Sequence, residues 1–352
     1  MISPPSFQET LPLILSEINP AEAKIIFFTS GSTGTPKTIE KTLHQLETEI
    51  VCLEKLWGNE MESCRFLSTV PHHHIYGLLF SLLWPVSAGR PLNLQTTHFW
   101  EDIMGLYSPG DILISGPSHL GRLSPLLVDP PPLEFLRIFS SGAPLSLESS
   151  QRAFKHLGAL PTEILGSTET GGIAYRQQDC EDACWTPFPN TQINTNEDGC
   201  LSLNSPFLPD TDDFQTQDRI RLNKDQTFTL LGRADRIVKI EGKRVSLDEI
   251  EQSLIALDEI SQIRIIPLLR IHDESFYKDE LGAVAVLSPL GIKFLENRGK
   301  AQLGTHFHQH LKVTCEPMTI PRRWRFISEF PVSDTGKISL QVFQDIFKGK
   351  IS

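Results

Sequence analysis

A segment rich in glycine and hydroxyl side chains near the start of the chain has the residue types that hold phosphate groups. It reads FTSGSTGTPK over residues 28–37 and follows the apolar run IIFF. Small residues let backbone N–H groups converge on an anion, and a lysine adds a point charge. The segment is not the P-loop of ATPases, G-x-x-x-x-G-K-[ST], because counting from Gly31 puts Pro36 where the second glycine is required. It therefore predicts a different phosphate-binding loop.

Three further polar or glycine-rich segments also follow predicted strands. They are PHHHIYG after RFLSTV (residues 65–77), SGAPL after FLRIFS (residues 135–145) and STETGG after TEILG (residues 162–172). Ligands of open α/β sheets bind outside the carboxyl ends of the strands. Together with the first segment, these four strand ends predict the rim of an active site.

The elements that must position these segments are short strands alternating with helices. Over residues 25–175, apolar runs such as IIFF and DILIS alternate with helical periodicity, which predicts a mostly parallel sheet covered by helices. An amphipathic helix that ends at Gly58 is expected because apolar residues recur at three- and four-residue steps: Leu43, Leu46, Ile50, Leu53 and Trp57.

The pattern changes after residue 185 to turns and short strands, and the last third mixes strands and helices. We predict an α/β protein with a large N-terminal domain of mostly parallel sheet layers, residues 1–234, in which residues 185–234 are β-rich. A small α+β C-terminal domain is expected over residues 235–352. Its segment RRWRF fits either a basic docking site for an acidic partner or an edge strand with one wet face, and we favour the strand.

The composition is that of an acidic, ordinary soluble protein. The 352 residues carry a formal charge of −11 with a pI near 5.5, which argues against a general nucleic-acid binder and against docking on an anionic membrane. No apolar stretch reaches membrane-spanning length, and the N-terminus lacks the pattern of a secretory signal. Six sparsely spaced cysteines fit reduced thiols, so a cytoplasmic location is expected.

Seven motifs, in this order along the chain, resemble the adenylate-forming superfamily of acyl-CoA synthetases, peptide-synthetase adenylation domains and luciferase. They are FTSGSTGTPK, PHHHIYG, SSGAPL, LGSTETGG, TQD, GRADRIVKIEGKRVSLDEIE and PVSDTGK. The resemblance extends over residues 25–347. Within the superfamily, the segments around PHHHIYG and PVSDTGK look most similar to acyl- and aryl-activating ligases of aryl-polyene or xanthomonadin-type pathways.

The resemblance implies a ligase that uses ATP and Mg²⁺ to turn a carboxylic acid into acyl-AMP and then passes the acyl group to a thiol. In the phosphate loop it implies contacts from Thr29, Ser30, Gly31, Ser32, Thr33, Gly34 and Lys37. Thr168 would bind the α-phosphate, and Glu169 would ligate Mg²⁺, which prefers hard oxygen ligands. Gly142 and Ala143 would leave a slot for adenine, and Gly166 would also bind the nucleotide. Asp218 would accept the ribose hydroxyls, and Arg233 would reach ribose or phosphate.

The same resemblance assigns roles to the C-terminal part. Lys337 would bridge the carboxylate and the α-phosphate during adenylation, and Lys239 would serve thioester formation after the domain rotates about Asp235. His74 would lie beside the acyl pocket. A metal site at the three adjacent histidines is disfavoured because neighbouring side chains on an extended segment point to opposite sides.

The sequence also departs from the family in ways that leave alternatives open. Only two dozen residues precede the phosphate loop, Leu165 replaces an aromatic residue against adenine, and Gln217 replaces a glycine. The favoured function is an acid–thiol ligase acting on an aryl or fatty acid, with coenzyme A or an acyl carrier protein as acceptor. The alternatives are a non-catalytic acyl-adenylate-binding module and one half of a split ligase that needs a partner chain.

Overall fold

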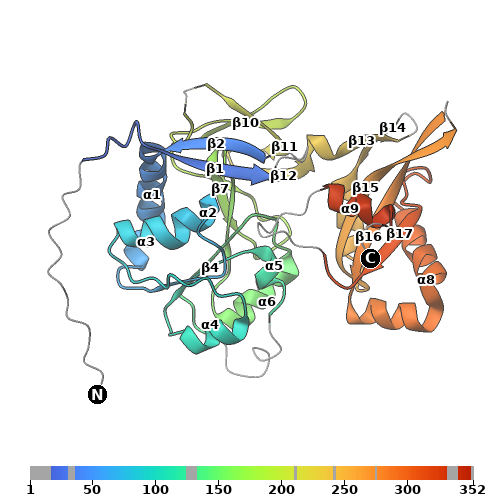
Figure 1. The fold of residues 1–352 in the computed structure, drawn as a ribbon, viewed down its shortest axis with the longest axis horizontal. Coiled ribbons are helices and arrows are strands. Elements are labelled where there is room, and N and C mark those ends of the chain that lie inside the picture. The colour runs from blue at the N-terminus through green and yellow to red at the C-terminus, as the bar shows by residue number, and fades with distance from the viewer. Residues whose placement is uncertain are drawn as a thin grey trace, which may run out of the picture.

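The computed structural model describes residues 17–30, 36–123, 133–209, 212–240, 243–273, 276–330 and 340–349. Figure 1 shows a larger lobe that ends with β12 (Phe228–Arg233) and a smaller lobe that begins with β13 (Ile237–Ile240). No helix in the described part of the chain combines the length and the apolar character needed to cross a membrane.

A six-stranded sheet forms the centre of the larger lobe. Its strands in spatial order are β3 (Phe66–Ser68), β4 (Ile112–Ser115), β5 (Arg137–Ser141), β6 (Thr162–Ser167), β7 (Gly171–Gln177) and β8 (Thr186–Pro187). Strands β3 to β6 pair in parallel, whereas β7 and β8 are antiparallel additions. The prediction of a mostly parallel sheet is confirmed.

Helices cover both faces of this sheet because its strands are apolar on both faces. On one face, Phe66, Ile114 and Phe139 pack against α1 (Leu43–Trp57), a π-helix (Leu78–Leu83) and α3 (Trp84–Ser87). On the other face, Leu67, Leu113 and Ile138 pack against α4 (Trp100–Leu106) and α6 (Leu147–Leu157). Short helices α2 (Ile75–Gly77) and α5 (Pro117–Leu120) follow β3 and β4, and a 3₁₀ turn (Gly58–Glu60) follows α1.

The amphipathic helix expected before Gly58 is confirmed as α1. Thr42 caps its N-terminus through a capping box with Gln45, in which each side chain bonds the other's backbone N–H. The apolar stripe that predicted the helix lies against the sheet: Leu46, Leu53 and Trp57 are buried.

The phosphate-loop strand does not belong to the central sheet, which corrects the expectation that all four polar segments follow its strands. Strand β1 (Lys24–Ser30) instead pairs antiparallel with β2 (Pro36–Thr42) in a separate two-stranded ribbon. Phe27 is buried while Ile26 and Phe28 are exposed, the alternation of a ribbon with one wet face. The short run IIFF cannot distinguish such a ribbon from a buried parallel strand.

A four-stranded antiparallel sheet follows, in the order β12, β11 (Phe214–Leu222), β10 (Cys200–Asn204) and β9 (Gln192–Thr195). A bridge between Trp185 and Phe228 connects it to the segment that leads into β8. Turns and short strands were expected in this part of the chain, and the structure has them.

The smaller lobe contains a hairpin and a three-stranded sheet with helices on both faces. Its elements are a 3₁₀ turn (Ala234–Arg236), β13, β14 (Lys243–Ser246), α7 (Leu247–Ile255), β15 (Ile260–Asp273), β16 (Phe276–Leu287), α8 (Pro289–Leu311), β17 (Arg323–Ile327) and α9 (Leu340–Phe347). RRWRF forms most of β17, an edge strand, as predicted. Among the described residues, no hydrophobic cluster combines residues from before 231 with residues after 237. The proposed boundary at residue 235 remains a prediction.

Candidate active site

The turn between β6 and β7 carries Thr168 and Glu169. The hydroxyl groups of Ser167 and Thr170, which flank these two residues, stabilise the turn by hydrogen bonds. The Ser167 N–H donates to Thr170 Oγ1 at 3.1 Å, and the Thr170 N–H donates to Ser167 Oγ at 3.2 Å. Thr170 is buried, with its hydroxyl also donating to the Gly171 carbonyl. The turn therefore presents Thr168 and Glu169 outward from a closed hydrogen-bonded base.

Glycines allow this turn to pack closely. A Cβ atom at Gly166 would lie 2.5 Å from the Gly171 carbonyl oxygen across the hairpin. Gly171 has φ of +71°, where an L side chain is strained. Gly166 is predicted to bind the nucleotide. The close packing across the hairpin already explains why this position is a glycine, whether or not a ligand contacts it.

Strand β2 approaches the same turn and places Lys37 beside the predicted metal ligand. Lys37 Nζ lies 3.4 Å from Glu169 Oε1, and the two side chains are 64% and 31% exposed. Alternate residues of a strand share a face, so Lys37, Ile39 and Lys41 point to the same side of β2. The structure brings together two groups that the sequence places 132 positions apart.

Beneath the turn, the same face of β2 supplies a buried lysine that the sequence analysis missed. Lys41 Nζ donates to the Glu169 carbonyl at 2.7 Å and to the Phe207 carbonyl at 2.9 Å, and the residue is only 2% exposed. Gln45 Nε2 also donates to the Phe207 carbonyl, at 3.0 Å. Burial lowers the pKa of Lys41, while the nearby carboxylates of Glu49 and Glu169 act against that shift.

Glu49, on the buried face of α1, completes this base. Its Oε1 accepts the Gly172 N–H at 2.8 Å. Burial raises the pKa of Glu49 to about 7, against the opposing effects of the Gly172 N–H and Lys41. The signal that could have revealed these residues is polarity at core positions: Gln45 and Glu49 lie on the buried stripe of an amphipathic helix, where apolar residues are expected.

The predicted ribose ligand and its basic neighbour face each other across two strands. Asp218 of β11 pairs in register with Arg233 of β12, and Arg233 Nη1 lies 3.2 Å from Asp218 Oδ1. Arg233 also contacts Asp235 at 2.7 Å, just where the chain leaves the larger lobe. Burial raises the pKa of Asp218, against the attraction of Arg233. A carboxylate held by a half-exposed guanidinium is available to accept hydroxyl hydrogen bonds.

The adenine segment lies at the carboxyl end of β5. Gly142 has φ of +94°, and a Cβ atom built on it would have nothing within 4 Å. Ser141 Oγ donates to the Ile164 carbonyl at 2.9 Å, which fixes the end of β5 against β6. Gly142 and the neighbouring Ala143 thus border open space at a strand end. Leu165 packs against the hydrophobic cluster of the antiparallel sheet.

His74 follows β3 and begins α2, with its carbonyl accepting the Leu78 N–H at 2.7 Å. Its ring lies 4.2 Å from that of His73. Two residues on, burial raises the pKa of Tyr76 well above its usual range. No group of three or more His, Cys, Asp or Glu within the described ranges is arranged to hold a metal ion.

Several predicted site residues cannot be placed in this geometry. Gly31, Ser32, Thr33, Gly34 and Lys337 lie outside the described residues. Thr29 and Ser30 end β1, and Lys239 pairs with Arg244 in the β13–β14 hairpin; only their backbones are described. Their roles stay predictions.

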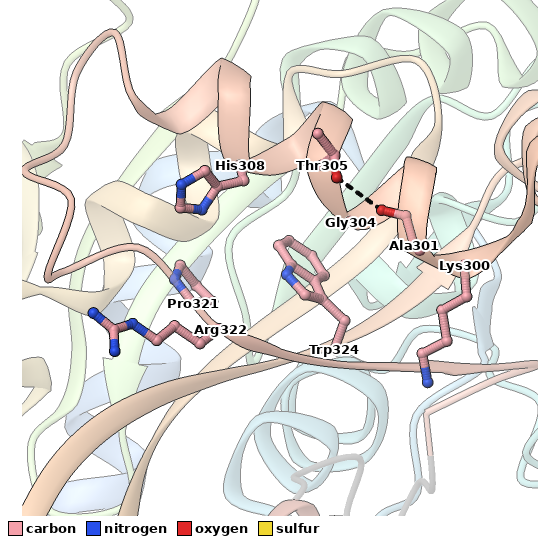
Figure 2. A pocket seen from close by; sticks show the side chains of 8 residues that line it. All are labelled: Lys300, Ala301, Gly304, Thr305, His308, Pro321, Arg322 and Trp324. Atoms are coloured by element: carbon pink, nitrogen blue, oxygen red, sulfur yellow. Dashed lines mark hydrogen bonds between the residues drawn. The ribbon is translucent and has the colours of Figure 1, made fainter.

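A separate cavity lies in the smaller lobe and contains none of these residues. It has a volume of about 430 Å³ and is lined by Lys300, Ala301, Gly304, Thr305 and His308 of α8 and by Pro321, Arg322 and Trp324. Figure 2 shows that it lies between α8 and the segment entering β17, with the Thr305 hydroxyl bonded to the Ala301 carbonyl of its own helix. The predicted chemistry is elsewhere, at the β6–β7 turn.

The fold and the family match identify an adenylate-forming enzyme. Residues 5–199 match the AMP-binding enzyme family, and the chain belongs to that family. Similar proteins include a 4-coumarate–CoA ligase of Cereibacter sphaeroides, 28% identical over 321 residues that cover 90% of this chain and 71% of that protein. A second, from Rhodobacter capsulatus, is 31% identical over 64% of this chain and 56% of its own length.

A solved structure shares the fold. ATP-bound MatB from Rhodopseudomonas palustris has a TM-score of 0.73 and 18% identity, with 93% of this chain and 68% of that chain covered. The resemblance to the adenylate-forming superfamily, first inferred from seven motifs, is confirmed.

Proposed function

We propose that the protein is an ATP-dependent acid–thiol ligase that adenylates an aryl or fatty carboxylic acid and transfers the acyl group to a phosphopantetheine thiol. The observation that supports this most directly is the convergence of Lys37 and Lys41 on the turn that presents Glu169. In a chain of the AMP-binding enzyme family, this cluster combines a cation for phosphate with a hard oxygen ligand on a fixed turn.

The first half-reaction brings a carboxylate against the α-phosphate of ATP. A carboxylate oxygen forms the new P–O bond while the bond to the bridging oxygen of the β-phosphate breaks, so pyrophosphate leaves and acyl-AMP remains. Both reactants are anions, so positive groups must offset the charge that develops. Lys37 and the loop of residues 29–34 would hold the β- and γ-phosphates, and Thr168 would bind the α-phosphate.

The residues present fit an Mg²⁺ site of the kind that substrate completes. Mg²⁺ is usually held by one or two carboxylates together with substrate phosphates and water. Glu169 is the carboxylate on this turn, and it is accessible from outside. When bound, Mg²⁺ would supply charge neutralisation at the phosphates.

The nucleoside would be held at the neighbouring strand ends. Asp218 would accept the ribose hydroxyls, with Arg233 holding the carboxylate in place and reaching ribose or phosphate. The open space beside Gly142 and Ala143 would accept adenine, and His74 would border the acyl pocket.

In the second half-reaction the thiol sulfur attacks the acyl carbon, the bond to AMP breaks, and the thiol proton is released. Lys337 would act in the first step and Lys239 in the second, with Asp235 as the hinge about which residues 235–352 rotate. The acceptor would be coenzyme A or an acyl carrier protein. The relatives' names support coenzyme A, since both are CoA ligases. A cytoplasmic location remains a prediction from composition.

ATP–pyrophosphate exchange across a panel of aryl and fatty acids tests the proposal. Exchange with at least one acid, followed by thioester formation with coenzyme A or a carrier protein, would support it. An absence of exchange with every acid, in protein that binds Mg·ATP by calorimetry, would favour a non-catalytic module or a split ligase instead. Adding a partner chain distinguishes those two.

A further inference from the structure

Lys41 is unusual because its buried ammonium group hydrogen-bonds main-chain carbonyls that are remote in sequence. Its partners, Glu169 and Phe207, lie 128 and 166 positions further along the chain. A lysine has three N–H donors, and here two are directed at these carbonyls. Burying such a group costs free energy unless it is fully bonded, so this geometry constrains both segments strongly.

The surroundings leave the turn little freedom to move toward the helix. Glu49 holds the Gly172 N–H from the α1 side. A Cβ atom at Gly171 would lie 2.6 Å from Glu49 Oε2, so the backbone and the carboxylate are already in close contact. The turn is thus fixed by Lys41 at its tip and by Glu49 at its base.

We infer that Lys41 is a positioning residue: by holding the main-chain carbonyl of Glu169, it fixes the direction in which the Glu169 carboxylate leaves the β6–β7 turn. The inference deepens the proposed function and rests on it, because it depends on Glu169 acting at the phosphates. Strand β2 then serves the site twice, through Lys37 at the carboxylate and through Lys41 beneath it. Misplacing a reacting group by about 1 Å is enough to slow an enzyme severely.

The competing explanation is that Lys41 and Glu49 only stabilise the fold. The two groups are buried and of opposite charge, and each acts electrostatically on the pKa of the other. Removing one of two such charges destabilises a protein, whereas replacing both is often neutral. The two explanations therefore predict different activities for the double variant Lys41→Met/Glu49→Gln. This variant removes both charges, which should restore stability, but it leaves the Glu169 carbonyl without its lysine donor, which should keep the activity low if Lys41 positions Glu169.

The experiment measures thermal unfolding and ATP–pyrophosphate exchange for Lys41→Met, the double variant and Lys24→Met. Lys24 is a matched control on the same ribbon, in an exposed ion pair with Glu40 at 2.7 Å. We expect the double variant to recover most of the stability lost in Lys41→Met, yet to keep a fall in kcat/KM for ATP of about ten- to a hundredfold, the loss of one charged hydrogen bond. The half-saturating Mg²⁺ concentration should rise, and the KM for the acid should change less than twofold.

A mutant cycle with Glu169→Gln tests whether Lys41 acts through Glu169. In the Glu169→Gln background, adding Lys41→Met should cost less than threefold, because coupled groups are not additive. Full recovery of exchange in the double variant, or purely additive losses in the cycle, would overturn the inference. If the single variant does not fold, the double variant still decides.

Failure of the proposed function gives a different result. In that case the wild type would show no exchange with any acid, whether or not it binds Mg·ATP by calorimetry, and the positioning role would fall with it. Wild-type exchange with unaffected Lys41 variants would instead refute the positioning role alone.

Discussion

Replacing Glu49 by glutamine should change how stability depends on pH, because this carboxyl group titrates at different pH values in the folded and unfolded chain. Burial raises the pKa of Glu49 from an ordinary 4.5 to about 7. Between these values the folded protein binds a proton that the unfolded chain does not, so the stability contributed by this group is lost as pH rises. Above pH 7 the loss is complete.

The magnitude follows from the linkage relation. From pH 5 to pH 8, the wild type should lose about 2.5 kcal/mol of unfolding free energy through Glu49, at 1.36 kcal/mol per unit of pKa difference. Glutamine has no proton to bind and can still accept the Gly172 N–H. The difference in stability, variant minus wild type, should therefore rise by about this amount over the same range.

Other groups facing Glu49 do not reverse this slope. Burial raises the pKa of Cys52 to about 11, so that thiol stays protonated throughout. Burial lowers the pKa of Lys41 on β2, and without the Glu49 carboxylate that pKa falls further, so any contribution of Lys41 to the difference has the same sign. The Gly172 N–H on β7 does not titrate.

The assay is urea unfolding at pH 5, 6, 7 and 8 at constant ionic strength, followed by tryptophan fluorescence. Trp57 lies on α1 itself and is buried, so it reports on the helix that carries Glu49. Glu47→Gln is the matched control: Glu47 is exposed on the same helix, and its variant should parallel the wild type. A pH-independent difference for Glu49→Gln, or one that falls with pH, would refute the reasoning.

Three further predictions concern the catalytic groups. Gly34→Val should raise the KM for ATP sharply in a folded protein, since a side chain there would obstruct converging N–H groups; unchanged ATP kinetics would exclude the phosphate-loop role. Glu169→Gln should reduce exchange by orders of magnitude, with partial recovery at raised Mg²⁺, and near-native exchange would contradict its role as a ligand. Lys337→Ala should abolish exchange but still convert supplied acyl-AMP to thioester. Lys239→Ala should mainly impair thiolation, and Asp235→Pro should block acyl transfer while exchange continues. Separate assays of the two half-reactions check these three variants. If folded Lys337→Ala loses both half-reactions equally, a rotating domain is excluded.

Local periodicity and motif order predicted much of the fold. Helix α1 could be predicted because Leu46, Leu53 and Trp57 form a stripe that ends at Gly58. The pairing of β1 could not, since Ile26 and Phe28 are exposed in a run that reads as uniformly apolar. A short apolar run does not encode its partner strand.

The site shows the same limit. Glu169 and Asp218 were identified through motif resemblance, which gives residue types but no contacts. The base formed by Lys41 and Glu49 was missed because their partners are main-chain groups of Glu169, Phe207 and Gly172, which leave no side-chain pattern in the sequence. Polarity on the buried stripe of α1 marks Glu49 in the sequence, whereas Lys41, on β2, has no such signal.

The bond from Lys41 to the Phe207 carbonyl also has a consequence for the order of events during biosynthesis. At about 5–20 residues per second, the ribosome needs roughly 8–33 s to add the 166 residues from 42 to 207. Until then the lysine lacks one of its two carbonyl partners, because only the Glu169 carbonyl, 128 positions along the chain, is available, and burying a partly bonded ammonium group is costly. The β1–β2 ribbon and α1 can form early, but Lys41 and Gln45 cannot yet make their hydrogen bonds to the Phe207 carbonyl. The base of the nucleotide site is therefore completed only after the chain has emerged past β10, so the nascent protein cannot hold a finished site before most of the larger lobe exists.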